Sequence, residues 1–222
     1  MKIAICISGS IKNTKSLNYI NNIRSKYDTK IFIHTWDIRN KKEFDDTTWS
    51  KANNLELEKI IDFNADKILI ENFSNKLSYL NRIFNEANFK DKIRQDIGTI
   101  SMYYSIFKSN QLKIDYEKEN SMIFDCVIRS RFDSNVQQQF DFIENADLTQ
   151  INIPHGRDWG GLNDQFAFGN SYQMNIYSDL INNLPSINNS YHSETMLRSY
   201  VNNTNLAINR CNLEVKIHHE SN

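Results

Sequence analysis

Residues 123–134 read IFDCVIRSRFDS and place an apolar strand directly before a cluster of charge. The run from Ile123 to Ile128 has the composition of a strand that is buried in a sheet. Arg129 and the residues up to Ser134 then add two arginines and an aspartate. Open α/β sheets bind their ligands at the carboxyl ends of the strands, where loops converge. The segment therefore predicts a buried strand with a binding site at its end.

Strands and helices alternate in the chain before this segment. The continuous apolar run Lys2–Ser8 predicts a buried first strand, Ile31–Ile33 predicts a second and Lys67–Ile70 predicts a third. Apolar residues at helical spacing predict helices over residues 17–27, 55–62 and 77–87 and from about residue 99. Asn13 or Thr14 is the expected cap of the first helix. This alternation is typical of an α/β fold with a largely parallel sheet.

The second half of the chain predicts further strands with mixed directions. The expected strands are residues 151–153, 165–168, 206–208 and 213–217, and the expected helices are residues 172–180 and 193–201. The chain is 222 residues long and 40% hydrophobic, which suits one domain with a substantial core. We therefore expect a mostly parallel, mixed sheet that is flanked by helices.

Overall charge excludes two classes of partner. The 26 basic and 27 acidic side chains nearly cancel, so the whole chain does not attract nucleic acid or an anionic membrane over long range. Apart from Arg129 and Arg131, no basic stripe is interleaved with aromatic residues, which also disfavours a nucleic-acid partner. Any anionic ligand must therefore be bound by a local cluster of cations.

The cysteines and the N-terminus indicate a cytoplasmic protein. Cys6, Cys126 and Cys211 are odd in number, occur in apolar contexts and lack the spacing of a metal site, so we expect buried free thiols. The apolar run that ends at Ile7 is too short for a signal peptide. No apolar run approaches the roughly 20 residues of a transmembrane segment.

The first strand ends in a candidate phosphate cradle. Ser8, Gly9, Ser10 and Lys12 supply small hydroxyl side chains, a flexible backbone and a cation. A helix N-terminus that binds phosphate requires these features. Many ordinary turns after a first strand look the same, so both interpretations are open.

The second strand ends in His34 and Trp36, with Thr35 between them. An aromatic and two polar side chains at a strand end can flank a base or a ribose. The alternative is that Trp36 packs under a loop.

Alternation along an extended chain places Arg129, Arg131 and Asp133 on one face. Two cations and one carboxylate leave a surplus positive charge that water or an anion must compensate. A diphosphate, with Asp133 also holding a divalent cation, would satisfy all three side chains. The alternative is a buried network of arginine and aspartate that joins two loops.

Residues 158–164 read DWGGLND and predict a loop that closes over a substrate. Gly160 and Gly161 give the backbone freedom. A sugar stacked on Trp159, with its hydroxyls held by Asp158 or Asp164, would fit such a loop. The alternative is a plain tight turn with a capping residue.

Three more residues are candidates for the site. His155 lies just upstream of this loop, and Glu194 opens a predicted helix, where the dipole favours a carboxylate whether or not it is catalytic. His218, with His219 beside it, follows the last strand and is either a metal ligand or part of a frayed tail.

Four blocks of the chain together resemble small GT-A-type glycosyltransferases of surface-polysaccharide gene clusters and of some large DNA viruses. The blocks are ICISGS at 5–10, IFIHTW at 31–36, VIRSRFD at 127–133 and LNDQFAFG at 162–169. They occur in the expected order, and the resemblance covers nearly the whole chain.

The resemblance implies a single Rossmann-like GT-A domain over residues 1–222. Its first half, about residues 1–135, would bind a nucleotide-diphosphate sugar, with UDP or dTDP favoured. Its second half, about residues 136–222, would bind a glycan or glycolipid acceptor. Metal-dependent members bind Mn²⁺ or Mg²⁺ through an Asp-x-Asp motif, and His218 or His219 would match their C-terminal histidine ligand. Here Arg131 replaces the first aspartate and Asp133 matches the second, so metal dependence and metal independence are both open.

An inverting glycosyltransferase needs one base to deprotonate the acceptor while a metal or an arginine stabilises the departing diphosphate. Glu194 and Asp164 are the candidate bases, with Glu194 preferred, and a retaining mechanism would need neither. The rival function is a non-catalytic module that binds a nucleotide-sugar or a glycan. Phosphoryl or sulfuryl transfer ranks last, because the sequence lacks the motif G-x-x-x-x-G-K-[ST].

Overall fold

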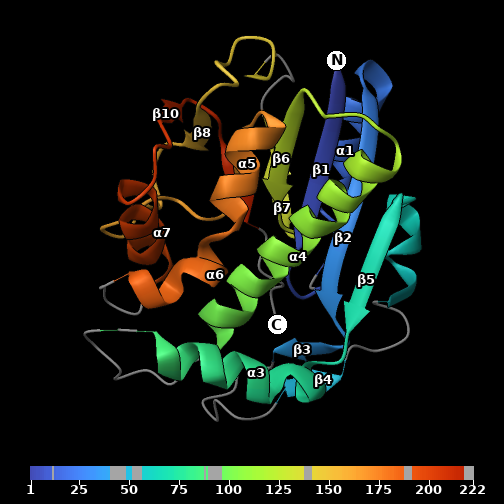
Figure 1. Ribbon diagram of the computed structural model, residues 1–222. Coiled ribbons are helices and arrows are strands. Elements are labelled where there is room, and N and C mark those ends of the chain that lie inside the picture. Colours follow the sequence, from blue (N-terminus) through green and yellow to red (C-terminus); the bar gives the residue numbers. More distant parts are fainter. Residues whose placement is uncertain are drawn as a thin grey trace.

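The computed structural model describes residues 1–11, 13–40, 49–51, 57–87, 89, 97–137, 142–187 and 192–217. These residues form a central sheet, and helices cover both of its faces (Figure 1). The first part of the predicted helix over residues 55–62 lies outside them, as do Lys12, His218 and His219.

Seven strands form the central sheet in the order β10-β8-β9-β6-β1-β2-β5. They are β1 (Lys2–Ser8), β2 (Asp28–Trp36), β5 (Lys67–Glu71), β6 (Cys126–Ser130), β8 (Ile151–Pro154), β9 (Ala167–Gly169) and β10 (Ile208–Cys211). Strands β5, β2, β1 and β6 are parallel, and β9 runs antiparallel between β6 and β8. The predicted α/β fold with a mostly parallel, mixed sheet is therefore confirmed.

Two small antiparallel sheets accompany the central one. β3 (Ile38–Asn40) pairs with β4 (Trp49–Lys51), and β7 (Ser134–Val136) pairs with β11 (Val215–Ile217). Of these four strands only β11 was expected. Each of the other three is only three residues long, which is too short for a pattern in the sequence to reveal.

Most helices lie close to their predicted ranges, but a 3-10 turn at residues 61–63 occupies the end of the predicted helix over residues 55–62, and the short helix at residues 180–183 was not expected. The helices are α1 (Leu17–Lys26), α3 (Phe73–Glu86), α4 (Gly98–Glu119), α5 (Ser171–Ser178), α6 (Leu180–Asn183) and α7 (Ser193–Asn202), with 3-10 turns η1 (Ile61–Phe63) and η3 (Leu184–Ser186). The cap of α1 was predicted wrongly, because Ser16 precedes the helix and its side chain makes no capping hydrogen bond.

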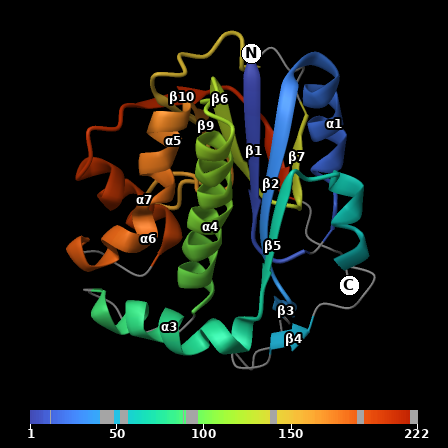
Figure 2. The same ribbon diagram turned by 45° about the vertical axis from the view of Figure 1, so that its right-hand side comes forward.

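Alternation in β1 sorts the core into two layers. Ile3, Ile5 and Ile7 face the cluster that includes α1, whereas Ala4 and Cys6 face the cluster beneath α4. Figure 2 shows these two helices on opposite faces of the sheet. The small side chains of β1 on the α4 face leave room for this long helix to pack closely.

Some expectations need correction at their edges. β6 begins at Cys126 and not at Ile123, whose side chain is 74% exposed. Asp125 anchors the start of the strand by accepting a hydrogen bond from the N–H of Lys2. β6 also continues past the predicted end at Ile128 to Ser130, so Arg129 lies inside the strand. The cysteines are free thiols as expected, with Cys6 and Cys126 buried, but Cys211 is only half-buried.

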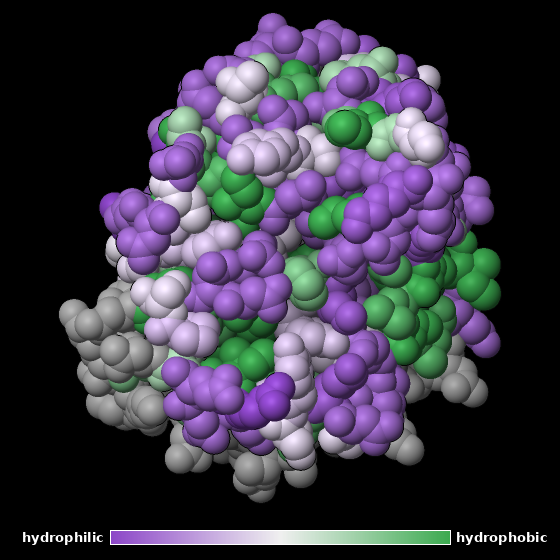
Figure 3. Space-filling model, viewed as in Figure 1, coloured by the Kyte–Doolittle hydropathy of each residue, from purple (hydrophilic) through white to green (hydrophobic). Residues whose placement is uncertain are grey.

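The surface on the side of the molecule that carries α4 is mostly hydrophilic (Figure 3). Hydrophobic colour gathers at the right over β5, the edge strand, where Ile68 and Ile70 are 43% and 45% exposed. Among the described residues, no helix combines the length and the apolar character that crossing a membrane requires.

Candidate functional site

The order in which successive parallel strands are added to the sheet reverses at β1, so β1 and β6 flank a topological switch point. From β1 the chain continues to β2 and β5 on one side, and it then returns to form β6 on the other side of β1. The loops after two such neighbouring parallel strands diverge, and ligands bind between them. Ser8–Ser10 and Arg131–Asp133 lie at these two strand ends. Two of the segments that the sequence singled out are therefore neighbours at the position where such sheets bind ligands.

The turn after β1 is built on Gly9, whose φ of +111° favours glycine. Its N–H donates to Ser105 Oγ at 2.9 Å, and its carbonyl accepts from Thr35 Oγ1 at 2.8 Å. The predicted cradle amide is therefore already bound to a side chain. Ser8 Oγ is buried and has no hydrogen-bond partner among the described residues, whereas Ser10 is half-buried.

The side chains of His34 and Trp36 are both buried. His34 Nδ1 lies 2.7 Å from Ser105 Oγ, and Nε2 lies 3.0 Å from Glu71 Oε2. Trp36 stacks on Tyr104 with the ring centroids 5.4 Å apart. These contacts join the ends of β2 and β5 to α4, which fits the packing alternative for Trp36.

Arg131 and Asp133 form a two-point ion pair. Arg131 Nε and Nη2 donate to Asp133 Oδ1 and Oδ2, both at 2.8 Å. Burial lowers the pKa of Arg131, but the hydrogen bonds to Asp133 outweigh burial and leave the pKa raised. Asp133 is only 3% exposed. Both of its oxygens are thus bound by a guanidinium, the fork geometry that suits a carboxylate.

Asp133, the carboxylate that the resemblance assigns to a divalent metal, is not free to ligate one, because both of its oxygens are bound by Arg131. Proteins hold Mg²⁺ through one or two carboxylates together with substrate phosphates and water, so the state of this single carboxylate matters. The described ranges contain no group of three His, Cys, Asp or Glu side chains that could hold a metal ion. Asp133 is held by Arg131, and His218 lies outside these ranges.

Arg129 lies inside β6, opposite Cys6 of β1, and is 1% exposed. None of its three guanidinium nitrogens has a hydrogen-bond partner in the part of the chain that the structure describes. Burial lowers the pKa of Arg129, and the nearby Tyr177 and Asp164 oppose this shift. The predicted trio on one face is therefore divided, since Asp133 pairs with Arg131 and Arg129 lies deeper.

The two candidate bases both lie within electrostatic range of the buried hydroxyl of Tyr103. Burial raises the pKa of Tyr103 well above its usual value, and the charges of Asp164 and Glu194 add to this shift. Asp164 is 5% exposed and Glu194 is 9% exposed. Tyr103 Oη donates to the carbonyl of Ser193 at 2.7 Å, which ties α4 to the first turn of α7. The fold thus brings both carboxylates to the face of the sheet that holds Arg129.

Backbone contacts join the 158–164 loop to α7. The N–H of Leu162 donates to the carbonyl of Glu194 at 2.9 Å, and Arg198 donates to the carbonyl of Gly161 at 2.6 and 3.1 Å. A Cβ on Gly161 would overlap the carbonyl of Glu194. Glycine is therefore required at this position for the close approach of the two segments.

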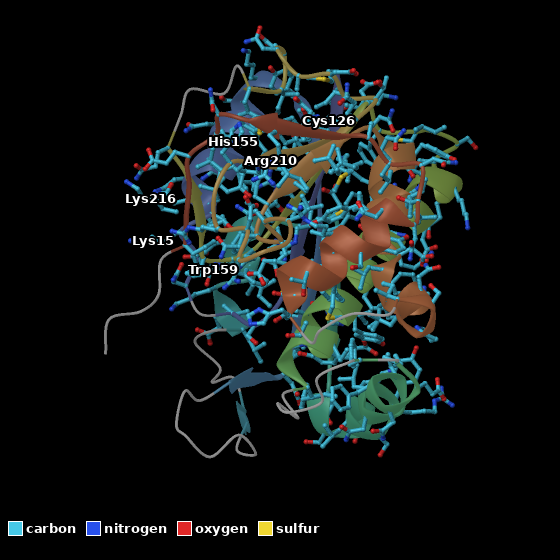
Figure 4. The ribbon with its side chains drawn as sticks, turned by 90° about the vertical axis from the view of Figure 1, so that its left-hand side faces the viewer. Lys15, Cys126, His155, Trp159, Arg210 and Lys216 are labelled. Carbon is cyan, nitrogen blue, oxygen red and sulfur yellow. The ribbon has the colours of Figure 1, made fainter. Side chains whose placement is uncertain are left out.

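Trp159 is 73% exposed, and Figure 4 shows it on one side of the molecule. Its φ is +42°, and Arg157 and Gly160 also have positive φ, at +55° and +84°. Such a conformation costs a non-glycine residue on the order of 1 kcal/mol, so other contacts must hold it. Asp158 supplies one, because its carboxylate accepts from Arg210 Nη2 at 2.8 and 3.0 Å.

His155 is exposed and follows β8. Figure 4 shows it well apart from Trp159 on the same side of the molecule. The structure therefore does not place these two predicted acceptor-binding residues together.

Sequence reasoning missed several residues of the site: Tyr103 and Ser105 on α4 and Tyr177 on α5. Aromatic residues at helical spacing are typical of packing against a sheet, so the sequence does not distinguish these from core residues. Their contacts with strand ends identify them only in the folded chain.

Comparison with solved structures finds two glycosyltransferases among the similar chains. The apo form of mouse xyloside xylosyltransferase 1 has a TM-score of 0.43 and 9% identity, over 95% of this chain and 84% of that chain. The galactosyltransferase LgtC in complex with donor and acceptor sugar analogues has a TM-score of 0.43 and 10% identity, over 90% and 70%. At these values we draw no conclusion about activity from the likeness.

Comparison with curated protein sequences finds no match. A protein-family model, by contrast, matches the chain over residues 1–217, from the start of β1 through the end of β11. That range includes both strands of the switch point, the 158–164 loop and α7. The chain therefore belongs to the family described as "Domain of unknown function (DUF7796)".

Proposed function

We propose that the protein is a GT-A-type glycosyltransferase of surface-polysaccharide biosynthesis. It moves a sugar from a nucleotide-diphosphate sugar, with UDP or dTDP favoured, to a hydroxyl of a glycan or glycolipid acceptor, with inversion. The observation that carries the proposal is that Arg129 and Arg131 lie at the carboxyl end of β6, beside β1, with Asp164 in electrostatic range of both arginines. Glu194 is in electrostatic range of their neighbour Tyr103. Cations suit the diphosphate of a donor, and carboxylates suit an acceptor hydroxyl.

The chain would divide its work along the sheet. Residues from about 1 to 135 contribute β1, β2, β5 and β6 and hold the donor. Residues from about 136 to 222 contribute the loop with Trp159 and the start of α7, and they hold the acceptor. The exposed indole of Trp159 offers an apolar face of the kind on which sugar rings stack.

The transfer step needs one base and one stabilised leaving group. The bond between the sugar carbon and the diphosphate oxygen breaks, and its electron pair stays on the diphosphate. The acceptor oxygen forms the new bond to that carbon, and its proton passes to a carboxylate. Glu194 is the preferred base, because it lies in the first turn of α7, directly beside the 158–164 loop that would hold the acceptor.

Asp164 is the second candidate, but it lies close enough to Arg129 to act on that side chain's pKa. Attraction to a neighbouring cation would fix the orientation of this carboxylate. Asp164 therefore suits orientation of the acceptor hydroxyl more than proton transfer.

Binding and turnover together test the proposal. A thermal-shift panel of UDP-, dTDP-, GDP- and CMP-sugars comes first. A ligand at about 100 times its dissociation constant adds roughly 2.7 kcal/mol, which corresponds to several degrees for a chain of this size. Release of nucleotide diphosphate in the presence of a glycan acceptor then reports transfer.

The variant Glu194→Gln separates an enzyme from a binding module. We expect it to keep the thermal shift and to lose turnover by 10²–10⁴-fold, the usual contribution of a general base. Glu119→Gln at the exposed end of α4 is the matched control and keeps both. A nucleotide-sugar that binds without turnover in the wild type would favour the non-catalytic module, and no shift with any nucleotide would reject the donor site.

A further inference from the structure

We infer that Ser8, Arg129 and Tyr177 form a buried oxyanion site that holds the departing diphosphate without a divalent metal. The inference rests on the proposed glycosyl transfer. Ser8, Arg129 and Tyr177 are 3%, 1% and 1% exposed. In each of them, the polar atoms at the end of the side chain have no hydrogen-bond partner among the described residues.

Register places two of these side chains on one face of the sheet. Arg129 of β6 is paired with Cys6 of β1. Ser8 lies two residues beyond Cys6 and therefore shares its face, toward the carboxyl end of the strand. Helix α5 contacts β6 and carries Tyr177, which acts electrostatically on Arg129. The unpartnered atoms thus belong to adjacent strands and to the helix that covers them.

The chemistry of these atoms selects an anion. A guanidinium donates through its N–H groups and accepts nothing, and the serine and tyrosine hydroxyls can also donate. A buried charge that lacks a partner costs several kcal/mol, unless it meets an opposite charge. An oxyanion with several acceptor oxygens, such as a phosphate group, would satisfy all three side chains together.

Asp164 is the internal group that could take this role, and it does not. It lies near enough to oppose the lowering of the Arg129 pKa by burial, yet no guanidinium nitrogen of Arg129 has a hydrogen bond within the described residues. Arg131 is committed to Asp133 by two hydrogen bonds. Of the two arginines, Arg129 is therefore the one whose N–H groups remain available to a ligand.

The site would act when charge develops on the leaving group. As the sugar carbon separates from the diphosphate oxygen, the electron pair stays on that oxygen, which accepts from the Arg129 N–H groups. The acceptor oxygen bonds to the sugar carbon, and its proton passes to Glu194. Fixed donors aimed at developing charge are an effective form of transition-state stabilisation. Arg129 would supply the charge that metal-dependent enzymes take from Mn²⁺ or Mg²⁺.

The test is the affinity for UDP, dTDP and inorganic pyrophosphate, measured calorimetrically in EDTA and in Mn²⁺. We expect the wild type to bind a nucleotide diphosphate equally well in both, within about twofold. Arg129→Met should weaken binding about 100-fold, the loss of a charge-assisted contact in a buried site. Arg129→Lys should recover part of that loss, because it keeps the charge but not the fork of donors.

Two further variants keep the inference falsifiable if Arg129→Met fails to fold. Tyr177→Phe removes a single hydroxyl and should weaken binding about tenfold, in line with one hydrogen bond to a charged group. Arg82→Met on the exposed part of α3 is the control and should change nothing.

The outcomes separate the two proposals. Binding that requires Mn²⁺ and survives both Arg129→Met and Tyr177→Phe would overturn the oxyanion site but leave a glycosyltransferase possible. Metal-free binding of pyrophosphate that needs Arg129, with no preference for any nucleotide, would uphold the oxyanion site and count against the proposed function. If the wild type binds no diphosphate in either condition, both are overturned.

Discussion

Lys113 and Arg129 are two buried cations on the same face of the sheet, and the chain treats them differently. Lys113 of α4 is 0% exposed, and its Nζ donates to Glu117 Oε2, Ser171 Oγ and Asn175 Oδ1 at 2.9, 2.6 and 2.7 Å. All three of its N–H groups are thus satisfied. Arg129 has more donors and, within the described residues, uses none of them. The comparison teaches that this fold can satisfy a buried cation, so the unused donors of Arg129 support the proposed oxyanion site.

The strongest way to break this comparison is Lys113→Met. The substitution leaves Glu117 buried without its cation, and we expect the free energy of unfolding to fall by about 3–5 kcal/mol. Urea denaturation measures this loss. Lys67→Met removes a similar ion pair with Glu119 at the surface and should cost about 1 kcal/mol or less. Equal losses in the two variants would mean that burial does not set the value of these pairs.

Arg129→Met should have the opposite sign in the ligand-free protein. A buried guanidinium without hydrogen bonds is replaced by an apolar side chain of similar length, so stability should stay unchanged or rise by up to about 2 kcal/mol. The same urea experiment measures it. A loss of the size expected for Lys113→Met would show that Arg129 supports the fold, and the difference between the two cations would disappear.

A smaller effect on stability is expected on acidification, at Glu71, a third charged group with partners at the edge of the site. Burial raises the pKa of Glu71, but hydrogen bonds from His34, Lys76 and Tyr104 outweigh burial and lower it to about 2. The group binds fewer protons in the folded state, so its contribution is complete above its ordinary value of 4.5 and is lost as the pH falls toward about 2.

Glu71→Gln is the variant that isolates this contribution. The stability difference between the wild type and Glu71→Gln should shrink as the pH falls from about 5 to about 3. Urea denaturation at several pH values measures it. A difference that is constant over this range would show that Glu71 is not held ionised by its partners. If the difference shrinks as expected, Glu71 is, like Lys113, a charged group whose partners within the protein stabilise the fold.

Local patterns in the sequence were enough for most of the sheet. β1 was predicted with the bounds that it has, Lys2–Ser8, and β5 differs from its prediction by one residue, Glu71. Both strands are rich in Ile, which favours extended backbone whether the strand is buried, as β1 is, or lies at the edge of the sheet, as β5 does. The burial of Arg129 could not be predicted, because alternation assigns a face but not the depth to which α4 and α5 cover it.

The candidate site was predictable only in parts. Arg131 and Asp133 are two residues apart, so their pairing was among the alternatives that the sequence left open. Asp164 and Glu194 were named as bases, but their common neighbour Tyr103 follows from the packing of α4 against α7. The glycine at position 161 was interpreted as flexible, whereas the structure needs it for the contact with the backbone of Glu194.

The pairing of β1 has a consequence for the synthesis of this chain. One edge of β1 is paired by β2, which ends at Trp36, but the other waits for β6, which starts at Cys126. An apolar strand with an open edge is a template for aggregation, and a nascent chain elongates by about 5–20 residues per second. We therefore expect the stretch before Cys126 to be the interval in which a growing chain most needs a chaperone. Only a chain that has been made through α7 has both candidate bases, so turnover would also report that synthesis has passed this helix.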